Sequence, residues 1–366
     1  MDSFDHCGPA RGSRRSHAWF RRASTAGVII AFLVACTGRL PGSEFGEELA
    51  DAGPRDADAT DGGAVLDGGT PLDGGTTLDG GTVLDGGDLP VFDSSWGGFG
   101  TEPGQFVEPS SVDLDENGVV IVAGHENRIQ RFTRDGSPLE IWGEPGAGDG
   151  EFNHPHGLAV DDDLDLVYVG DQENHRLQVF TLTGEFVRQW GDAQFAHIHD
   201  IGIDRATGDV FVGDYELHTL RKFSGTGELL AELGGSGTGP LEFNGVWGID
   251  TDSNRNVYVA EAHNQRVQKL TVNGAFVDFW LGFDGVPFAK PTGVFVDGED
   301  VVYVCDSLAE MVYLFDVDGA PLERWDLAVI YGAPSEPEDI VISPDGRDIY
   351  IGEVAGHRVL HLVRER

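Results

Sequence analysis

Two histidines and one glutamate stand in short motifs whose chemistry suits a metal ion. His156 lies in a Pro-His-Gly motif, His199 in a His-Asp-Ile motif, and Glu338 in a Pro-Glu-Asp-Ile motif. Imidazole nitrogens and carboxylate oxygens are ligands of zinc and of other divalent ions, and three protein ligands leave a position for water. The alternative is that each side chain is bonded to neighbouring loops without a metal. The fold must bring the three together for the first interpretation to hold.

The elements that would position them belong to a repeat. An aromatic or aliphatic residue followed by Val or Ile recurs with spacings of 47, 43, 47, 45 and 47 residues, at Ile121-Val122, Tyr168-Val169, Phe211-Val212, Tyr258-Val259, Tyr303-Val304 and Tyr350-Ile351. Repeats of about 40 to 50 residues with several short strands each are typical of β-propeller blades. Six such pairs predict six blades.

Each unit contains four candidate strands. In the second unit they cover 157–161, 166–170, 175–180 and 185–191, separated by turn residues. The sixth unit ends at a third strand, 357–363, whereas 89–97 has the form of an outer strand and precedes the first inner strand. We therefore predict an all-β, six-bladed propeller of four-stranded blades, closed by the N-terminal strand 89–97 pairing into the last blade, which removes exposed sheet edges.

In a propeller, the residue before each inner strand and the loop between the second and third strands meet at one mouth of the central channel. The aligned positions before the inner strands are Ser110, His156, His199, Trp247, Thr292 and Glu338. Converging polar residues of different types can bind a ligand. We predict a ligand-binding rim composed of His156, His199, Tyr215, Trp247, Thr292 and Glu338. A metal held by His156, His199 and Glu338, with Zn²⁺ or Ca²⁺ near the channel axis, is a second hypothesis, and a calcium ion at Asp200 or Asp339 is a third.

Other repeated residues are interpreted as structural. The corresponding loop position is acidic in five units, at Asp171, Asp214, Glu261, Asp306 and Glu353, and Gly124 in the first. A shared turn-capping role fits these acids, and ion pairs with them fit the recurring Arg128, Arg176, Arg266 and Arg358. Trp96, Trp142, Trp190, Trp280 and Trp325 recur at outer-strand ends and are expected to pack between blades. Cys305 is expected to be a buried core thiol.

The repeats resemble NHL repeats, and the second unit, 152–161 leading to 168–180, carries nearly every position of that pattern. The resemblance covers 89–366 and implies a six-bladed propeller in a family of binding platforms, receptors and a few enzymes. One enzyme branch, the peptidyl-α-hydroxyglycine amidating lyases, is similar in the Pro-His-Gly and His-Asp-Ile motifs. That branch implies zinc-binding histidines in blades two, four and six and a catalytic tyrosine in blade three. Here His156 matches, Trp247 and Glu338 occupy the other two positions, and Tyr215 lies near the tyrosine position.

The segment before the repeats predicts export. A basic region precedes an apolar run, 26–35, that is too short to span a membrane. It ends in Leu-Val-Ala-Cys, which resembles the lipobox of bacterial lipoproteins and implies acylation of Cys36. We predict a signal peptide at 1–35 and a disordered, acidic, Gly-rich linker at 36–88, in which Leu-Asp-Gly-Gly recurs every six residues.

Charge restricts the partners. The chain carries 63 acidic and 24 basic residues, a net charge of −39, which argues against nucleic acid. We predict a monomeric propeller in the bacterial cell envelope, periplasmic or at the cell surface, anchored to the membrane only through Cys36. Its predicted role is to bind or scaffold a protein, peptide or glycan at the channel mouth. The alternative is a metal-dependent lyase or hydrolase that uses the mouth histidines, with Tyr215 as its catalytic residue.

Overall fold

The structure is a computed structural model that describes residues 89–191 and 194–364. The predicted signal peptide, Cys36 and the linker lie outside the described residues. Within the described ranges, no helix has the length and apolar character needed to cross a membrane.

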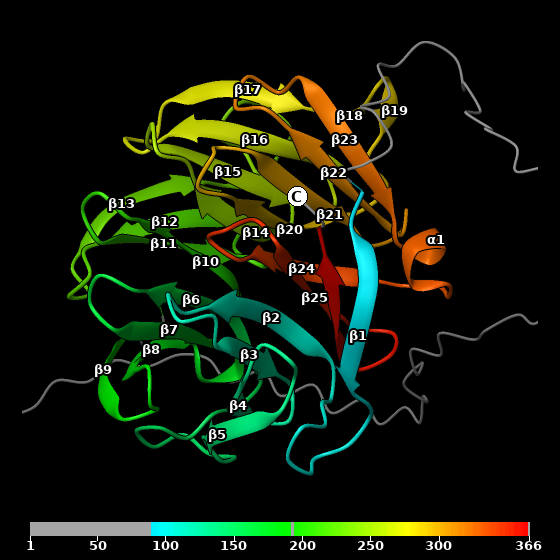
Figure 1. Cartoon of the computed structure of the whole chain (residues 1–366). Helices are drawn as coiled ribbons and strands as arrows, with labels where there is room; N and C mark the ends of the chain where they lie inside the picture. Colours follow the sequence, from blue (N-terminus) through cyan, green and yellow to red (C-terminus); the bar gives the residue numbers. More distant parts are fainter. Residues whose placement is uncertain (1–88, 192–193, 365–366) are drawn as a thin grey trace, which may run out of the picture. The chain divides into compact units, whose positions relative to one another are not determined.

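Six four-stranded antiparallel sheets form the blades of a propeller (Figure 1). The inner strands are neighbours in the order β2, β6, β10, β14, β20 and β24, and β24 returns to contact β2, so the ring is closed. Both the number of blades and the four strands in each confirm the prediction. The repeated pattern of buried residues in the second strand of each blade explains why six similar sequences fold into six similar sheets.

The first three blades contain β2 (Pro109–Leu114), β3 (Val120–Gly124), β4 (Arg128–Phe132) and β5 (Pro138–Trp142); β6 (Pro155–Asp161), β7 (Leu166–Asp171), β8 (Arg176–Thr181) and β9 (Phe186–Trp190); and β10 (Ile198–Asp204), β11 (Asp209–Asp214), β12 (Thr219–Phe223) and β13 (Leu229–Gly234). The last three contain β14 (Val246–Thr251), β15 (Asn256–Glu261), β16 (Arg266–Thr271) and β17 (Phe276–Trp280); β20 (Pro291–Val296), β21 (Val302–Asp306), β22 (Met311–Phe315) and β23 (Pro321–Asp326); and β24 (Pro337–Ile342), β25 (Asp348–Glu353), β26 (Arg358–Val363) and β1 (Val91–Gly97). A one-turn 3-10 helix, Gln172–Asn174, follows β7.

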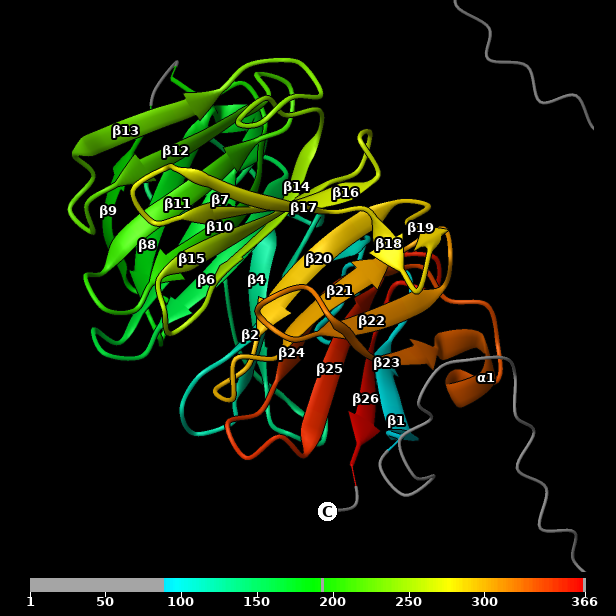
Figure 2. The ribbon, with the colours of Figure 1, turned by 90° about the horizontal axis from the view of Figure 1, so that it is seen from above.

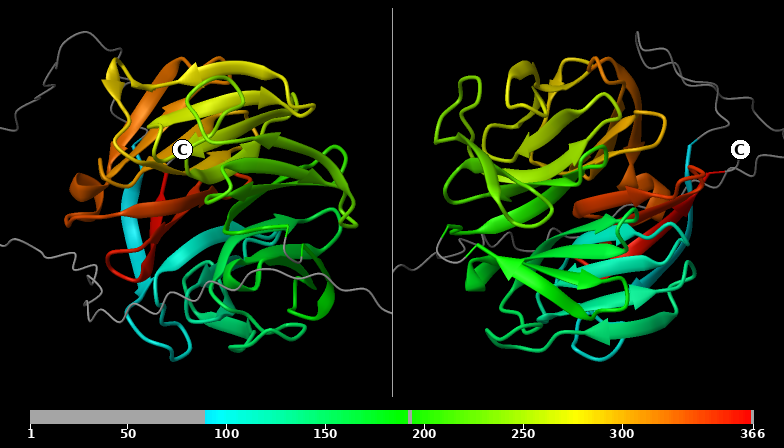
Figure 3. Two further views of the ribbon diagram at one scale, coloured as in Figure 1. Left: turned by 180° about the vertical axis from the view of Figure 1, so that it is seen from behind. Right: turned by 90° about the vertical axis from the view of Figure 1, so that its left-hand side faces the viewer.

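The N-terminal strand closes the ring, as predicted. β1 pairs antiparallel with β26, with Val91 opposite Val363 and Gly97 opposite Arg358. Figures 1 and 2 show β1 along the outer side of the last blade, and the view from behind in Figure 3 shows the same arrangement. The last blade is thus built from both ends of the described chain.

Besides the one-turn 3-10 helix, two elements were not predicted. A hairpin of β18 (Gly282–Phe283) and β19 (Val286–Pro287) follows β17, and helix α1 (Leu327–Tyr331) follows β23. The Asp326 side chain caps α1 by accepting a hydrogen bond from the Val329 amide, and Gly332 ends it at a φ of 82°. Both elements are too short to produce a periodic signal in the sequence.

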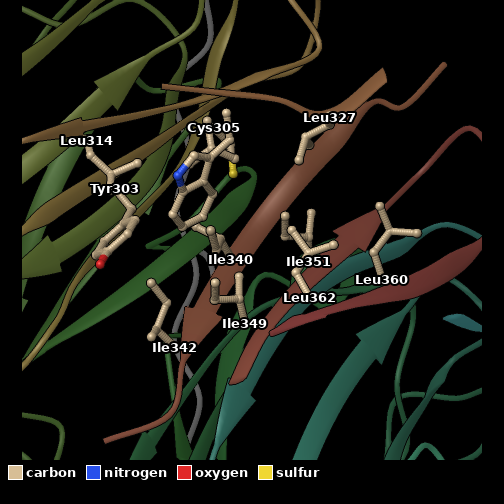
Figure 4. Packing of buried hydrophobic residues seen from close by; sticks show 12 residues of the cluster. Tyr303, Cys305, Leu314, Leu327, Ile340, Ile342, Ile349, Ile351, Leu360 and Leu362 are labelled. Atoms are coloured by element: carbon tan, nitrogen blue, oxygen red, sulfur yellow. The ribbon is translucent and has the colours of Figure 1, made fainter. Parts of the chain in front are cut away.

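The core lies between neighbouring blades. Figure 4 shows one such cluster, in which Cys305 of β21 lies among apolar side chains of blades five and six, including Ile340 and Ile351. Cys305 is fully buried, as predicted. Four of the five outer-strand tryptophans cover a glycine of the next blade. A Cβ on Gly136, for example, would lie 2.5 Å from the Trp96 ring, so glycine is required there.

Ion pairs fix the loops that face the channel mouth. Arg176 pairs with Asp171 at 2.7 Å and Arg266 with Glu261 at 2.5 Å, and both carboxylates are fully buried. The predicted turn-capping role is also confirmed, because the Asp171 carboxylate accepts a hydrogen bond from the amide of Asn153 in the preceding loop. These paired loops hold the segments that carry the candidate site.

Candidate functional site

The three predicted metal-binding residues come together. His156 at the start of β6, His199 at the start of β10 and Glu338 at the start of β24 each offer a ligand atom, and these atoms lie within 4.8 Å of one another. We call these residues the rim triad. Inner strands converge at the channel, so one residue from each of three blades can reach a common point. All three side chains are buried, with 6 to 7% exposure.

Hydrogen bonding determines which nitrogen of His156 is available. Its Nδ1 lies 2.8 Å from the carbonyl oxygen of His199. A carbonyl only accepts, so Nδ1 carries the proton and Nε2 keeps its lone pair. Metal-binding histidines are commonly oriented by this kind of bond. Because this Nδ1 carries a proton, it does not accept a hydrogen bond from the Gly157 amide, which lies 3.1 Å away.

His199 has an unpaired nitrogen. Its Nδ1 is buried and has no hydrogen-bond partner among the described residues. A buried polar atom without a partner costs free energy, which a bound metal ion or ligand would offset. The His199 ring lies 3.9 Å from the His156 ring and 4.1 Å from the Trp247 ring, measured between centroids.

Burial sets the protonation of the rim triad. Desolvation lowers the pKa of His156 well below its usual range, and the neighbouring His125 lowers it further. Desolvation likewise lowers the pKa of His199, with a smaller contribution from His156. For Glu338, desolvation raises the pKa to about 7, although Lys290 and the hydrogen bond from Trp247 act in the opposite direction. Neutral imidazoles are the form that binds a metal.

The rim triad fits a zinc-like ion after a small adjustment. Tetrahedral ligands about 2 Å from one ion are about 3.4 Å apart, so no separation between ligand atoms must shorten by more than about 1.4 Å. Side-chain rotation can supply that movement. The indole Nε1 of Trp247 donates to Oε1 of Glu338, which leaves Oε2 for an ion.

The remaining predicted rim residues differ in their environments. Tyr215 and Trp247 lie beside His199, with ring centroids 5.3 and 4.1 Å away, so the structure brings them to the mouth. Thr292 is fully buried, and its hydroxyl donates to the carbonyl of Pro337 at 2.9 Å. Ser110 is similarly buried. The Thr292 hydroxyl therefore joins neighbouring blades and does not face the mouth.

Asp200 and Asp339 line the channel below the rim. The carboxylate of Asp200 accepts a hydrogen bond from the Ile249 amide, and that of Asp339 accepts from the Val112 amide and the Ser111 hydroxyl. Each carboxylate thereby connects two blades. The channel cavity here has a volume of about 40 Å³ and none of the predicted rim residues lines it, so it has room for about one water molecule. A larger ligand does not fit into this cavity.

Three further histidines adjoin the rim triad, and the sequence analysis did not single them out. His125, His154 and His197 form what we call the histidine wall. The ring of His154 lies 3.8 Å from that of His125, which lies 5.5 Å from that of His156, while His197 lies 6.0 Å from His199. The sequences His-Pro-His and His-Ile-His, at the starts of two adjacent inner strands, could have indicated His154 and His197.

The histidine wall also contains unpaired nitrogens. His125 Nδ1 lies 3.0 Å from a carboxylate oxygen of Glu108, whereas its Nε2 is buried without a partner in the described ranges, as is Nδ1 of His197. Desolvation, with a smaller contribution from the neighbouring His154, lowers the pKa of His125 to about 3, so this ring is neutral. The mouth thus contains several neutral imidazoles, which can accept hydrogen bonds from a ligand or donate hydrogen bonds to it.

Comparisons with known proteins agree with the fold. The NHL repeat family matches residues 152–180 and 243–270. NHL repeat-containing protein 3 of Mus musculus is 36% identical over 98 residues, which cover 25% of this chain and 28% of that protein. Peptidylglycine alpha-amidating monooxygenase of Rattus norvegicus is 39% identical over 98 residues, covering 25% of this chain and 10% of that protein. The chain thus spans little more than a quarter, or less, of these curated relatives.

Among solved structures, the virginiamycin B lyase of Staphylococcus aureus is similar, with a TM-score of 0.54. The alignment covers 75% of this chain and 98% of that one at 13% identity, so it supports the fold alone. The chain therefore carries NHL repeats, folded as a six-bladed propeller with distant homology to the propellers of peptidylglycine amidating monooxygenases.

Proposed function

We propose that this protein binds a divalent metal ion of the zinc class at the rim triad and uses it to bind a protein, peptide or glycan ligand at the channel mouth. The observation that carries the proposal is the convergence of His156, His199 and Glu338 within 4.8 Å, from three different blades. The unpaired Nδ1 of His199 supports it independently. NHL propellers commonly serve as binding or scaffold folds, which agrees with a binding role.

Metal analysis tests the proposal. The full chain, purified without chelator or affinity metal, is equilibrated with zinc, dialysed and analysed by mass spectrometry. We expect about one zinc per chain, and loss of that zinc in His199→Ala, because the variant lacks a ligand. His263→Ala is the matched control, because His263 is exposed at the same mouth and lies outside the rim triad. Substoichiometric zinc that is equal in all three proteins would overturn the proposal.

A metal-dependent lyase or hydrolase is the second candidate. The observation that favours it is the Tyr215 hydroxyl, which lies 3.0 Å from Nε2 of His263 and belongs to a ring 5.3 Å from that of His199. A phenol paired with an imidazole beside a metal ion can transfer a proton to or from a substrate. Metal-dependent turnover that is lost in Tyr215→Phe while zinc remains bound would support this candidate. Metal-dependent ligand binding without turnover would favour the binding role.

We also propose that the protein is exported and anchored in the bacterial cell envelope by acylation of Cys36. The short apolar run before Leu-Val-Ala-Cys supports this anchor, and the acidic linker would hold the propeller away from an anionic membrane. In a bacterial host, we expect the full chain in the membrane fraction and Cys36→Ala outside it. Equal membrane association of both proteins would contradict the lipid anchor.

A further inference from the structure

Lys290 is an unusual cation in this protein. The chain contains three lysines. Lys222 pairs with Asp209 at 2.7 Å, and Lys269 donates to the carbonyl of Val317. All three ammonium groups lie over aromatic rings, and that of Lys290 is the nearest to its ring, 4.0 Å from the Trp247 centroid. Lys290 forms no ion pair with any residue of 89–191 or 194–364.

The contacts of Trp247 place this ammonium beside the rim triad. Trp247 lies against the ring of His199 and donates a hydrogen bond to Glu338. The backbone amide of Lys290 donates to the Asp306 carboxylate at 2.8 Å, which fixes the residue directly before β20. The ammonium acts electrostatically on Glu338 without forming a direct ion pair with it. A half-buried lysine with its backbone fixed and no direct ion pair can bind an anionic group.

The outer mouth has the opposite charge. Glu173, Glu216 and Glu336 are exposed and act electrostatically on His154, Tyr215 and Glu338, respectively. A molecule with several negative charges would be repelled by these glutamates. A single negative group that reaches the centre, on a molecule otherwise neutral or positive, would meet Lys290 and the rim triad without that penalty.

We propose that the mouth binds one carboxylate group of an otherwise neutral or cationic molecule, held between the Lys290 ammonium and a metal ion at the rim triad. The proposal rests on the proposed metal site and adds the chemical class of the ligand. The rings of Trp247, Tyr215 and His199 border the same space and can pack against a flat group attached to that carboxylate.

Four small aromatic probes test each part of this ligand description. Benzoate carries one carboxylate, benzamide is its neutral analogue, terephthalate carries two carboxylates, and 4-(aminomethyl)benzoate adds a positive group. We expect calorimetric titration of the zinc-loaded full chain to show binding of benzoate and 4-(aminomethyl)benzoate. Benzamide and terephthalate should bind at least about tenfold more weakly, since a charge-assisted contact is lost or repulsion is added.

Lys290→Met is the decisive variant, because methionine keeps a chain of similar length over Trp247 and removes the charge. We expect about tenfold weaker benzoate binding and unchanged zinc content, because Lys290 is not a ligand. Arg324→Gln is the matched control, since it removes one positive charge from an exposed position on β23. It should leave benzoate binding unchanged.

The proposal is overturned if Lys290→Met binds benzoate as tightly as the wild type, or if benzamide and benzoate bind equally. Failure of the metal site is separable, because zinc content is measured on the same samples. If the wild type holds no zinc, the proposed function fails. A titration in EDTA then tests the contact between the Lys290 ammonium and a carboxylate without a metal. Benzoate binding that depends on Lys290 under these conditions would support the carboxylate site. No such binding would refute it.

Discussion

Removing the Trp96 side chain tests how the ring is closed. Its indole joins the first and last blades, with ring centroids 5.9 Å from Phe132 of β4 and 5.8 Å from Tyr350 of β25. Replacing a core tryptophan by alanine costs about 3–5 kcal/mol, and because Trp96 is half-buried we expect about 3 kcal/mol. At about 2–4 °C per kcal/mol for a domain of comparable size, the Tm of Trp96→Ala should fall by about 6–12 °C.

We expect the closure to open locally as well. β1 has no hairpin connection to β26, so its pairing can break while the other blades remain folded. A loss of about 3 kcal/mol raises the population of that open state roughly 150-fold, because each 1.4 kcal/mol is a factor of ten. Native-state hydrogen exchange of the β26 amides that face β1 should accelerate by about this factor in Trp96→Ala.

Trp142→Ala is the matched control for Trp96→Ala. Trp142 ends β5, packs on Gly184 of the next blade in the same way, and belongs to a strand that a hairpin joins to its neighbour. We expect similar thermal destabilisation without faster exchange in β26. Equal acceleration of β26 exchange in both variants, or none in Trp96→Ala, would refute the role given to Trp96.

Three further predictions concern buried or partly buried groups. Arg266→Met leaves the fully buried Glu261 carboxylate without its cation, so the free energy of unfolding in denaturant should fall by about 3–5 kcal/mol. Adding Glu261→Gln to the same chain should restore part of that loss. An unchanged free energy of unfolding in Arg266→Met would contradict the structural role of the ion pair. Desolvation raises the pKa of Asp113 to about 7 against an unfolded value of 3.8, so the folded state holds the proton more tightly and stability should fall as the pH rises from about 4 through 7. Asp113→Asn should flatten that pH profile, and an unchanged slope would exclude Asp113 as its source. Desolvation raises the pKa of the Cys305 thiol well above its usual range, so a thiol reagent should modify it only after unfolding, and modification of the native protein would show that the site opens.

The sequence predicted the features that recur in most of the units. Strand alternation, the outer-strand tryptophans and the arginine–acid pairs each appear several times, so their common role could be inferred without knowing any one environment. The first blade shows how far this inference extends. Gly124 replaces the loop acid there, and Glu126, two residues later, lies 3.6 Å from Arg128 in its place. Comparison of spacings alone does not show such a substitution.

Features that occur once were harder to predict. Thr292 aligns with His156, yet its hydroxyl is turned toward Pro337 of the adjacent blade, because side-chain direction depends on what the neighbouring strand offers. The histidine wall comes from loops and strand ends of three blades, and its proximity to the rim triad arises only when the ring closes. Helix α1 and the β18–β19 hairpin lie between repeats, where no period applies.

Net charge is a poor guide to the ligand of this mouth. The chain's net charge of −39 argues against nucleic acid, which is sound for long-range interactions with the whole surface. At the mouth, however, the five repeated loop acids are fully buried, at Asp171, Asp214, Glu261, Asp306 and Glu353. Their carboxylates accept hydrogen bonds from backbone amides, and four of the five pair with arginines, so these groups are already occupied. Imidazoles, aromatic rings and the Lys290 ammonium remain around the rim triad, so the acidity that repels polyanions at a distance is compatible with binding one carboxylate at the centre.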